Sequence, residues 1–475
     1  MTTVPSTRRP GLALGGLAGR LEAAGTDLRT ELRAGLTTFM VMAYIIFVNP
    51  SILSAAGLPF EATVAATCLV AGVMTLAMGI FTNYPLAIAP GMGLNAVVAF
   101  QLVQGMRLPW QAAMGVIFLE GVVITVLVLT GFREAMMKAI PASLKRAIGV
   151  GIGLFILFIG MYQGGFVRVP VPLGQPLTAP PSVPLELGNF ATLPFLVALI
   201  GLLLGIALLA RGVPGALLLS ILGTTLIAMV IRYGTGAQVS TAPGKAEWPA
   251  QPLSFPDFST FGAGLNIDVF FHVGVITAIV TIFSIMLSDF FDTMGTVIGI
   301  GSEAGRLDEQ GRLPRLNRVL LIDSLGAVFG GIASSSSATT YIESAAGVAE
   351  GAKTGIASIL VGLLFLACLF IAPIAGIVPP EATAAALILV GFFMARVARE
   401  IDFSSIPDGL PALMTLITMP LTWSITNGIG AGFITYSFIK LVTGHAREVH
   451  LMMWLASAAF VLYFALPWLK QVFQF

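Results

Sequence analysis

Two stretches interrupt an otherwise apolar chain, Tyr84-Pro-Leu-Ala-Ile-Ala-Pro-Gly-Met-Gly-Leu-Asn95 and Ser334-Ser-Ser-Ser-Ala-Thr-Thr-Tyr-Ile-Glu343. Each leads into an apolar segment that is short for a membrane crossing, 90–104 in the first case and 342–350 in the second. Non-helical backbone is tolerated at membrane depth only where protein or a water-filled cavity surrounds it. Short, interrupted segments at matching places in two halves of a chain indicate a central binding site. We therefore expect the two stretches to meet at one site.

The rest of the sequence consists mainly of apolar segments. Of 475 residues, 57% are hydrophobic and 10% are charged, whereas soluble proteins carry about 25% charged residues. A helix that crosses a bilayer needs about 20 apolar residues, so the sequence predicts an all-α polytopic membrane protein. The predicted spans are 36–54, 61–81, 90–104, 111–131, 147–164, 194–210 and 213–231, then, after a polar stretch from Tyr233 to Asp268, 272–300, 319–333, 342–350, 354–374, 381–395, 409–422 and 424–439.

These fourteen transmembrane segments form two sets of seven. An odd number of spans in each half inserts the second half upside down relative to the first, which predicts two inverted repeats. Sliding one interrupted stretch onto the other places Asn95 opposite Glu343. A further apolar stretch, 449–469, is left over, and the sequence does not decide whether it spans the membrane.

The distribution of basic residues predicts the orientation, because cytoplasmic loops retain Lys and Arg. If the N-terminus is cytoplasmic and all fourteen segments cross, most basic residues fall on the cytoplasmic side. The residues that fall outside are Arg107, Arg168, Arg232 and Lys245, and Lys470 is assigned to neither side. We therefore expect a multi-pass protein of the cell membrane with its N-terminus in the cytoplasm.

Composition and motifs exclude several classes of function. The formal net charge is +1, which gives no basic field for nucleic acid. The two cysteines, Cys68 and Cys368, lie in apolar segments, which argues against a disulfide framework or a metal cluster. The sequence has no phosphate-binding loop and no His-Glu-x-x-His motif, so neither ATP-driven transport nor zinc hydrolysis is expected. We predict no cofactor, no metal and no enzymatic activity.

Five carboxylates lie inside predicted spans, and no Lys or Arg is placed in the middle of one. An ionised Asp near the bilayer centre costs at least about 2.5 kcal/mol, so each acid needs polar partners, a water-filled cavity or a proton. Each is therefore a functional candidate. Two of them have no polar cluster near them in sequence and are also read as structural. The five acids are Glu120, Asp289, Asp292, Asp323 and Glu343. The two without a nearby polar cluster are Glu120 and Asp323.

The eighth span carries two of these acids one helical turn apart, Asp289 and Asp292. At helical spacing Asp292 shares one face with small and polar residues. Close helix packing is the alternative explanation of the small residues, but packing does not account for two acids. The residues that share this face with Asp292 are Ser288, Gly295, Thr296 and Gly299.

The tenth and third spans supply the other candidates. Glu343 follows Thr339, Thr340 and Tyr341 at the expected start of a half-helix, where unpaired N–H groups favour an acceptor-rich ligand; capping its own helix is the alternative. In the third span Asn95 can donate and accept at once. Tyr44 and Asn49 of the first span are expected to make hydrogen bonds between helices rather than to contact a ligand.

Three motifs together resemble those of the nucleobase-cation symporter family, in its AzgA-like purine branch. They are Pro90-Gly-Met-Gly-Leu-Asn95, Asp292-Thr-Met-Gly-Thr296 and Thr339-Thr-Tyr-Ile-Glu-Ser-Ala-Ala-Gly347, and the resemblance runs from about Leu32 to Lys440. Glu343 looks like the essential glutamate of the family's tenth span, and Asn95 looks like the polar residue of its third span. The sequence departs from the family at Thr296, where relatives often have His or Asp, which leaves proton handling to carboxylates and keeps Asp289 as an alternative acid.

The resemblance implies a core domain that moves against a gate domain, and a homodimer formed through the gate. Its boundaries in this chain would be a cytoplasmic segment 1–35, core spans one to four at 36–131, gate spans five to seven at 132–232, an extracytoplasmic linker 233–271, core spans eight to eleven at 272–374, gate spans twelve to fourteen at 375–443 and a C-terminal apolar segment 444–475.

The resemblance also implies proton-coupled uptake of adenine, guanine or hypoxanthine. Asp292 and Glu343 would accept hydrogen bonds from purine N–H groups, and the Asn95 amide would both donate to the base and accept from it. Asp289, Asp292 and Glu343 would be the candidates for carrying the proton. The further residues of the substrate site would be Thr296 and the aromatic candidates Phe290, Phe291, Tyr341 and Tyr44.

Four alternatives remain at this point. Sodium is a competing coupling ion, and a uracil- or xanthine-type permease is a competing specificity. An anion transporter of similar architecture would be expected to offer positive charge or only helix dipoles at the half-helices, which the acids oppose. A membrane-embedded enzyme lacks a nucleophile and base pair or a metal-ligand set.

The orientation predicts which residues react with a membrane-impermeant thiol reagent. Gln238→Cys, in a background without Cys68 and Cys368, should be labelled in intact cells because the stretch from Tyr233 to Asp268 lies outside. Arg312→Cys should be protected until the membrane is permeabilised. The reverse pattern would contradict the orientation.

Overall fold

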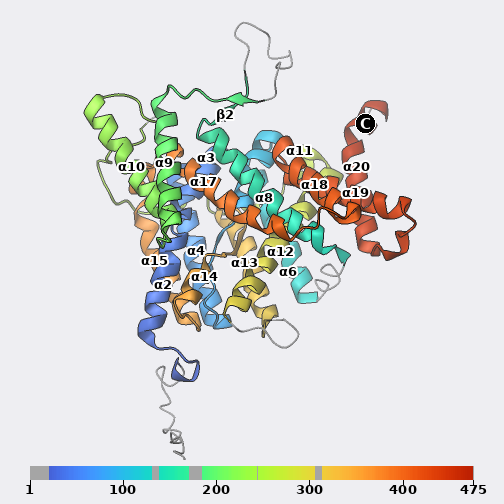
Figure 1. The fold of residues 1–475 in the computed structure, drawn as a ribbon, viewed down its shortest axis with the longest axis horizontal. Coiled ribbons are helices and arrows are strands. Elements are labelled where there is room, and N and C mark those ends of the chain that lie inside the picture. The colour runs from blue at the N-terminus through green and yellow to red at the C-terminus, as the bar shows by residue number, and fades with distance from the viewer. Residues whose placement is uncertain (1–20, 131–138, 171–184, 243, 305–312, 474–475) are drawn as a thin grey trace, which may run out of the picture.

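The computed structural model describes residues 21–130, 139–170, 185–242, 244–304 and 313–473, which are mostly helical (Figure 1). The elements of the first half are α2 (Leu28–Met42), α3 (Ile45–Ser54), α4 (Phe60–Thr82), β1 (Ile88–Pro90), α5 (Met92–Ala96), the π-helix η1 (Val97–Gly105), α6 (Trp110–Thr130), α8 (Ala142–Gln163), β2 (Val167–Arg168), β3 (Glu186–Leu187), α9 (Leu193–Ala210) and α10 (Ala216–Thr235).

The second half begins with two short helical turns and continues through twelve helical segments and one strand. These elements are η2 (Ala263–Leu265), α11 (Val269–Val273), α12 (Val275–Glu303), α13 (Leu316–Ala333), β4 (Ala338–Thr340), α14 (Ser344–Ala349), α15 (Gly355–Ala367), η3 (Cys368–Phe370), α16 (Ala372–Gly376), α17 (Pro380–Ala395), η4 (Arg396–Glu400), α18 (Ile406–Thr422), α19 (Ile425–Val442), η5 (Ala446–Glu448) and α20 (Leu451–Phe473).

Each of the fourteen predicted segments coincides with a helix in the structure, which confirms the predicted fold class. Among the described residues, ten helical stretches are long and apolar enough to cross a membrane, and 451–469 of α20 is one of them. The interrupted third and tenth segments are short as predicted: α5 and η1 make up the third, and α14 has only 6 residues. The basic residues Arg133, Lys138, Arg306 and Arg312 lie outside the described residues.

The two interrupted stretches pair with each other. Strands β1 and β4 are antiparallel, with Ile88 opposite Thr340 and Pro90 opposite Ala338. All six residues of the two strands are buried. The sequence predicted non-helical backbone here, and it did not predict that the two stretches would form a ladder with each other.

Helices of one half pack against helices of the other half. Helix α4 packs along α15, α6 along α13, and α8 along α17 and α18. Each pair joins elements that are far apart in the sequence, as the different colours of the neighbouring ribbons show (Figure 1). The two repeats are therefore interwoven, and neither half forms a separate body.

Glycines allow α4 and α15 to pack very closely. A Cβ atom added at Gly79 would lie 2.6 Å from the carbonyl oxygen of Gly355, and one added at Gly362 would lie 2.7 Å from the carbonyl oxygen of Gly72. On both helices the paired glycines are seven residues apart, so they lie on one face. Small residues of this kind let transmembrane backbones approach and gain van der Waals contact.

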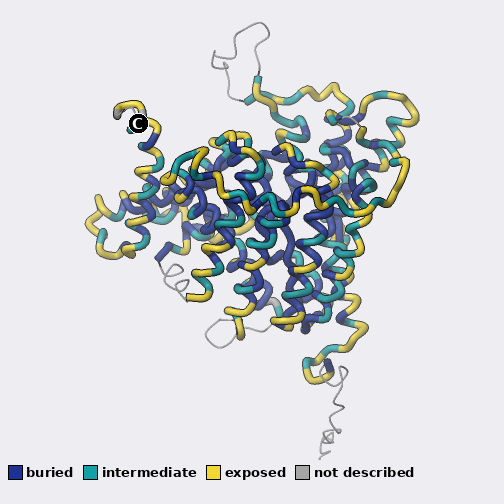
Figure 2. Tube along the Cα trace, turned by 180° about the vertical axis from the view of Figure 1, so that it is seen from behind, coloured by how far each residue is buried: buried dark blue, intermediate teal, exposed yellow. Residues whose placement is uncertain are grey.

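The outer surface of the helix bundle is apolar where lipid would lie. Exposed and intermediate residues lie along the outside of the bundle and buried residues fill its interior (Figure 2). Large apolar side chains are exposed on several outer helices, among them Leu203 of α9, Leu226 of α10 and Phe438 of α19, each more than half exposed. This distribution suits a protein whose surrounding solvent is hydrocarbon.

The α4–α15 contact predicts a strong effect of one added methyl group. Gly79→Ala should destabilise the protein by about 1 to 3 kcal/mol through overpacking. The control is Gly149→Ala in α8, where an added Cβ meets nothing within 4 Å, so the change should be neutral or stabilise by up to about 1 kcal/mol. Thermal unfolding of the purified protein in detergent measures both, and equal midpoints for the two variants would contradict the packing.

Candidate functional site

The strand pair holds the starts of the two half-helices, α5 and α14, next to each other. The Gly91 N–H donates to the carbonyl oxygen of Ser337 (2.8 Å), and the Tyr341 N–H donates to the carbonyl oxygen of Ala87 (2.9 Å). The Tyr341 hydroxyl donates to the carbonyl oxygen of Pro90 (2.6 Å). These bonds cross from one stretch to the other, so the two half-helices are positioned as a unit.

Two of the predicted acids lie beside this crossing and are partly exposed, Asp292 of α12 and Glu343 immediately before α14. The Tyr44 hydroxyl, at the break between α2 and α3, donates to Glu343 Oε1 at 2.6 Å. A Cβ added at Gly295, one turn after Asp292, would meet no atom within 4 Å. We call Asp292 and Glu343 the open acids, because both residues are only partly buried.

Asp323 of α13 is buried and fully engaged in holding β4. It accepts hydrogen bonds from the Thr340 N–H, from the Thr340 hydroxyl and from the Thr293 hydroxyl, each at 2.7 Å. A carboxylate that accepts from a strand N–H stabilises backbone that no helix satisfies. This cluster agrees with the structural reading of Asp323, although its partners were not evident in the sequence.

Two further acids, Glu120 of α6 and Asp289 of α12, are completely buried. Their carboxyl groups lie within hydrogen-bonding reach of one another. The Ser337 hydroxyl donates to Asp289 Oδ2 at 3.1 Å. We call Glu120 and Asp289 the buried acid pair; the sequence had treated Glu120 as an isolated acid.

Asn95 in α5 is also completely buried, and neither its amide nitrogen nor its amide oxygen has a hydrogen-bond partner in the structure. A buried amide without partners is costly, so an unused donor and acceptor are available at this position. Asn49, by contrast, donates to the Thr67 hydroxyl and to the Ser335 carbonyl oxygen, as expected of a bond between helices.

The other predicted site residues are buried in the same region. Thr296 is 8% exposed, and Phe290 packs edge-to-face on Phe291 with ring centroids 5.2 Å apart. Tyr341 uses its hydroxyl on Pro90, so only its ring is free to face a ligand.

Gln101 is a residue that sequence reasoning missed. Its side chain accepts from the Ile425 N–H (2.9 Å) and donates to the Thr426 hydroxyl (2.6 Å). This contact ties η1 to the first turn of α19. A lone Gln in an apolar span was the signal available in the sequence.

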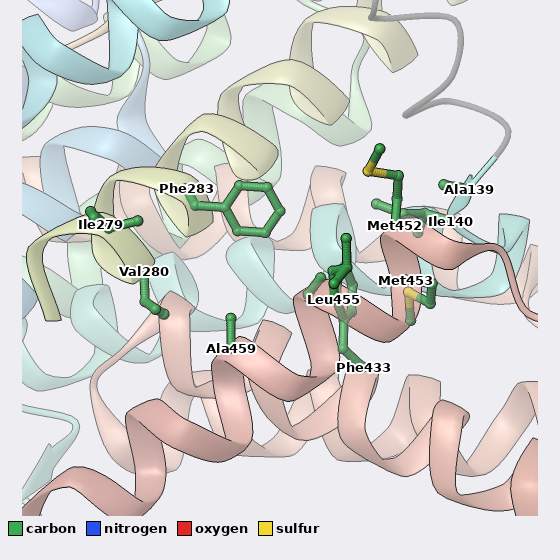
Figure 3. Close-up of a pocket in the computed structure, with 11 residues that line it drawn as sticks. Ala139, Ile140, Ile279, Val280, Phe283, Phe433, Met452, Met453, Leu455 and Ala459 are labelled. Carbon is green, nitrogen blue, oxygen red and sulfur yellow. The ribbon is translucent and has the colours of Figure 1, made fainter. Parts of the chain in front are cut away.

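A separate cavity of about 270 Å³ lies between α12, α19 and α20 (Figure 3). Phe283, Phe433, Met452 and Leu455 line it, and all of its lining residues are apolar. Such a cavity offers nothing that would recognise a polar ligand. Among the described residues, no group of three His, Cys, Asp or Glu side chains is arranged to hold a metal ion.

The chain is similar to known transporters over most of its length. A family model described as the Permease family (Xan_ur_permease) matches residues 29–431. The adenine permease AdeP of Escherichia coli (strain K12) is 37% identical over 443 residues, which is 93% of this chain and 94% of the relative. The guanine/hypoxanthine permease PbuG of Bacillus subtilis (strain 168) is 38% identical over 457 residues, which is 94% of this chain and 98% of the relative.

Solved structures share the fold at low sequence identity. The transmembrane domain of the cyanobacterium bicarbonate transporter BicA matches with a TM-score of 0.59 and 16% identity, over 84% of this chain and 97% of that one. The murine Slc26a9 anion transporter in the inward-facing state matches with a TM-score of 0.58 and 14% identity, over 93% of this chain and 74% of that one.

The engagement of Asp323 predicts a graded loss of stability. Asp323→Ala leaves the buried Thr340 N–H without an acceptor, which should cost about 1 to 3 kcal/mol. Thr293→Val removes one donor and keeps the other two bonds, so its cost should be about 0.5 to 1.5 kcal/mol. Thermal unfolding in detergent tests the order, and an Asp323→Ala protein as stable as the parent would contradict this role.

Proposed function

The chain belongs to the Permease family and is a multi-pass membrane protein, and from this premise we propose that it takes up purine nucleobases, adenine, guanine or hypoxanthine, together with protons. The curated relatives named above support the purine class. The observation that carries the proposal is the pair of open acids, Asp292 and Glu343, beside the crossing of the two half-helices.

The chemistry of a purine base fits these groups. A purine is planar and neutral, with N–H donors at one edge and ring-nitrogen or carbonyl acceptors at others. The open acids accept from the N–H groups, and the Asn95 amide, which has no protein partner, both donates and accepts. Hydrogen bonds to charged groups are stronger than neutral ones, so the two carboxylates supply most of the recognition.

The open acids argue against an anion transporter, which is the main alternative function. The solved relatives with this fold include bicarbonate and anion transporters, but likeness of fold does not establish function. Two carboxylates beside the half-helix starts repel an anion at close range. A neutral base with N–H donors is therefore the better substrate for this site.

Transport requires the site to face each side of the membrane in turn. We propose that the core spans, 36–131 and 272–374, carry the site past the gate spans, 132–232 and 375–443, and that two gates pair in a homodimer. The bonds of Gln101 to the start of α19 join proposed core to proposed gate. They would have to break or shift as the core moves.

Binding measurements on variants of the open acids test the proposal. Glu343→Gln replaces an ionisable acceptor with an amide and should weaken purine binding by about tenfold to a hundredfold, since a hydrogen bond to a charged group contributes about 1.5 to 3 kcal/mol. Asp292→Asn should show a similar loss if Asp292 contacts the base. If Asp292 only carries the proton, binding should persist while accumulation driven by a pH gradient is lost.

The measurement is equilibrium binding of radiolabelled adenine, guanine and hypoxanthine to purified, monodisperse protein, with sulfate and a dicarboxylate as competitors. Glu61→Gln, at an exposed acid in the first turn of α4, is the matched control and should bind like the parent. Unchanged binding in both open-acid variants would disprove the site. Sulfate uptake without purine binding would disprove the purine assignment.

A further inference from the structure

The buried acid pair has more acceptor atoms than donors. Neither oxygen of Glu120 has a hydrogen-bond partner, and Asp289 Oδ1 has none either. The remaining oxygen, Asp289 Oδ2, accepts from the Ser337 hydroxyl. Both residues are 0% exposed. Four buried carboxyl oxygens therefore share one donor from the described residues, and unpaired buried acceptors are costly.

The surroundings of the pair make a second negative charge still less favourable. Among the described residues, the charged groups that face it are acids: Asp323 from α13 faces both members, and Asp292 from α12 faces Asp289. The neutral group that faces it is the Ser337 hydroxyl, from the backbone just before β4. Adjacent carboxyl groups in such a setting retain one proton between them. Ionising both groups would place two like charges at close range in a buried site, which costs free energy.

We propose that Glu120 and Asp289 form a proton-binding site, and that the proton they share is the one transported with the base. The inference rests on the purine uptake proposed above and deepens it. The open acids then bind the base, and the buried acid pair drives its accumulation. A carboxylate oxygen accepts the proton from a hydronium ion on one side of the membrane and returns it to a water molecule on the other side, so the step balances without a further reactant.

The site is connected to the substrate site by short paths. Asp289 and Asp292 are one turn apart on α12, so a proton on the buried acid pair reduces the repulsion felt by the open acid. Ser337 donates to Asp289, and its carbonyl oxygen accepts from the Gly91 N–H at the start of α5. Two residues further on, Thr339 lies in β4, which packs against α12, the helix that carries Asp292. Both routes link proton occupancy to the half-helices that position the base.

Two transport assays in proteoliposomes test the proposal with the full-length chain. Counterflow measures exchange of labelled base for unlabelled base and needs no net movement of protons, so it reports the proposed function alone. Accumulation driven by an imposed pH gradient requires proton coupling. Glu120→Gln, which resembles the protonated acid but cannot titrate, should retain counterflow and lose accumulation down to the level seen without a gradient. Glu61→Gln should retain both.

An infrared measurement on the purified protein tests the shared proton without transport. The parent protein should show the carbonyl stretch of a protonated carboxylic acid, and the difference spectrum between parent and Glu120→Gln should contain that band. The difference spectrum between parent and Glu61→Gln should not contain it. If Glu120→Gln does not fold, Asp289→Asn serves for both experiments.

The outcomes separate the two proposals. Full pH-driven accumulation by Glu120→Gln and Asp289→Asn, or no protonated-acid band in the difference spectrum, would overturn the proton site and leave purine uptake standing. Accumulation by the parent that follows a sodium gradient and ignores pH would do the same. A parent protein without purine counterflow would disprove the proposed function, and the infrared band would still decide whether the acid pair holds a proton.

Discussion

The pairing of β1 with β4 is the interaction on which the rest of the structure depends. Membrane interiors contain no water to satisfy free backbone groups, so extended backbone there must find partners within the protein. The ladder from Ile88 to Pro90 and from Ala338 to Thr340 supplies part of them, and side chains supply the rest. The Thr75 hydroxyl both accepts from the Ile88 N–H and donates to its carbonyl oxygen, and Asp323 accepts from the Thr340 N–H. Polar residues in α4 and α13 are thereby explained by the backbone that they satisfy.

Within this arrangement the five acids of the membrane segments fall into three groups. Asp323 is used by Thr340 and Thr293 and has a structural role. The open acids, Asp292 and Glu343, are partly exposed residues, whereas both members of the buried acid pair are 0% exposed. The division follows from helix geometry, because residues three apart on α12 point to neighbouring but different surroundings. One helix can thus present one acid to a ligand and another to a buried partner.

The sequence predicted the membrane class, the segments and the two interruptions, because apolar length and broken helical pattern are local properties. The same local properties made Asp292, with Gly295 after it, and Glu343, after its run of Ser and Thr, candidate site residues, which stays a prediction. The partners of Glu120 and Asp323 were not found, since α6 and α13 are apolar on most sides and their sequence pattern does not indicate which face meets which neighbour. Gln101 was missed because its role depends on the start of α19, and nothing in its own span points there.

The proposed purine site has to be reconciled with the anion transporters that share this fold. The positive dipole ends of two half-helices that meet at one centre favour negative charge. In the present chain Glu343 lies directly before one of those starts, and Asp292 faces the same crossing from α12. Carboxylates there offset the field of the half-helices and supply acceptors. Under the proposed function, the backbone frame would be common to both classes, while a few side chains on it would reverse the charge that the site prefers.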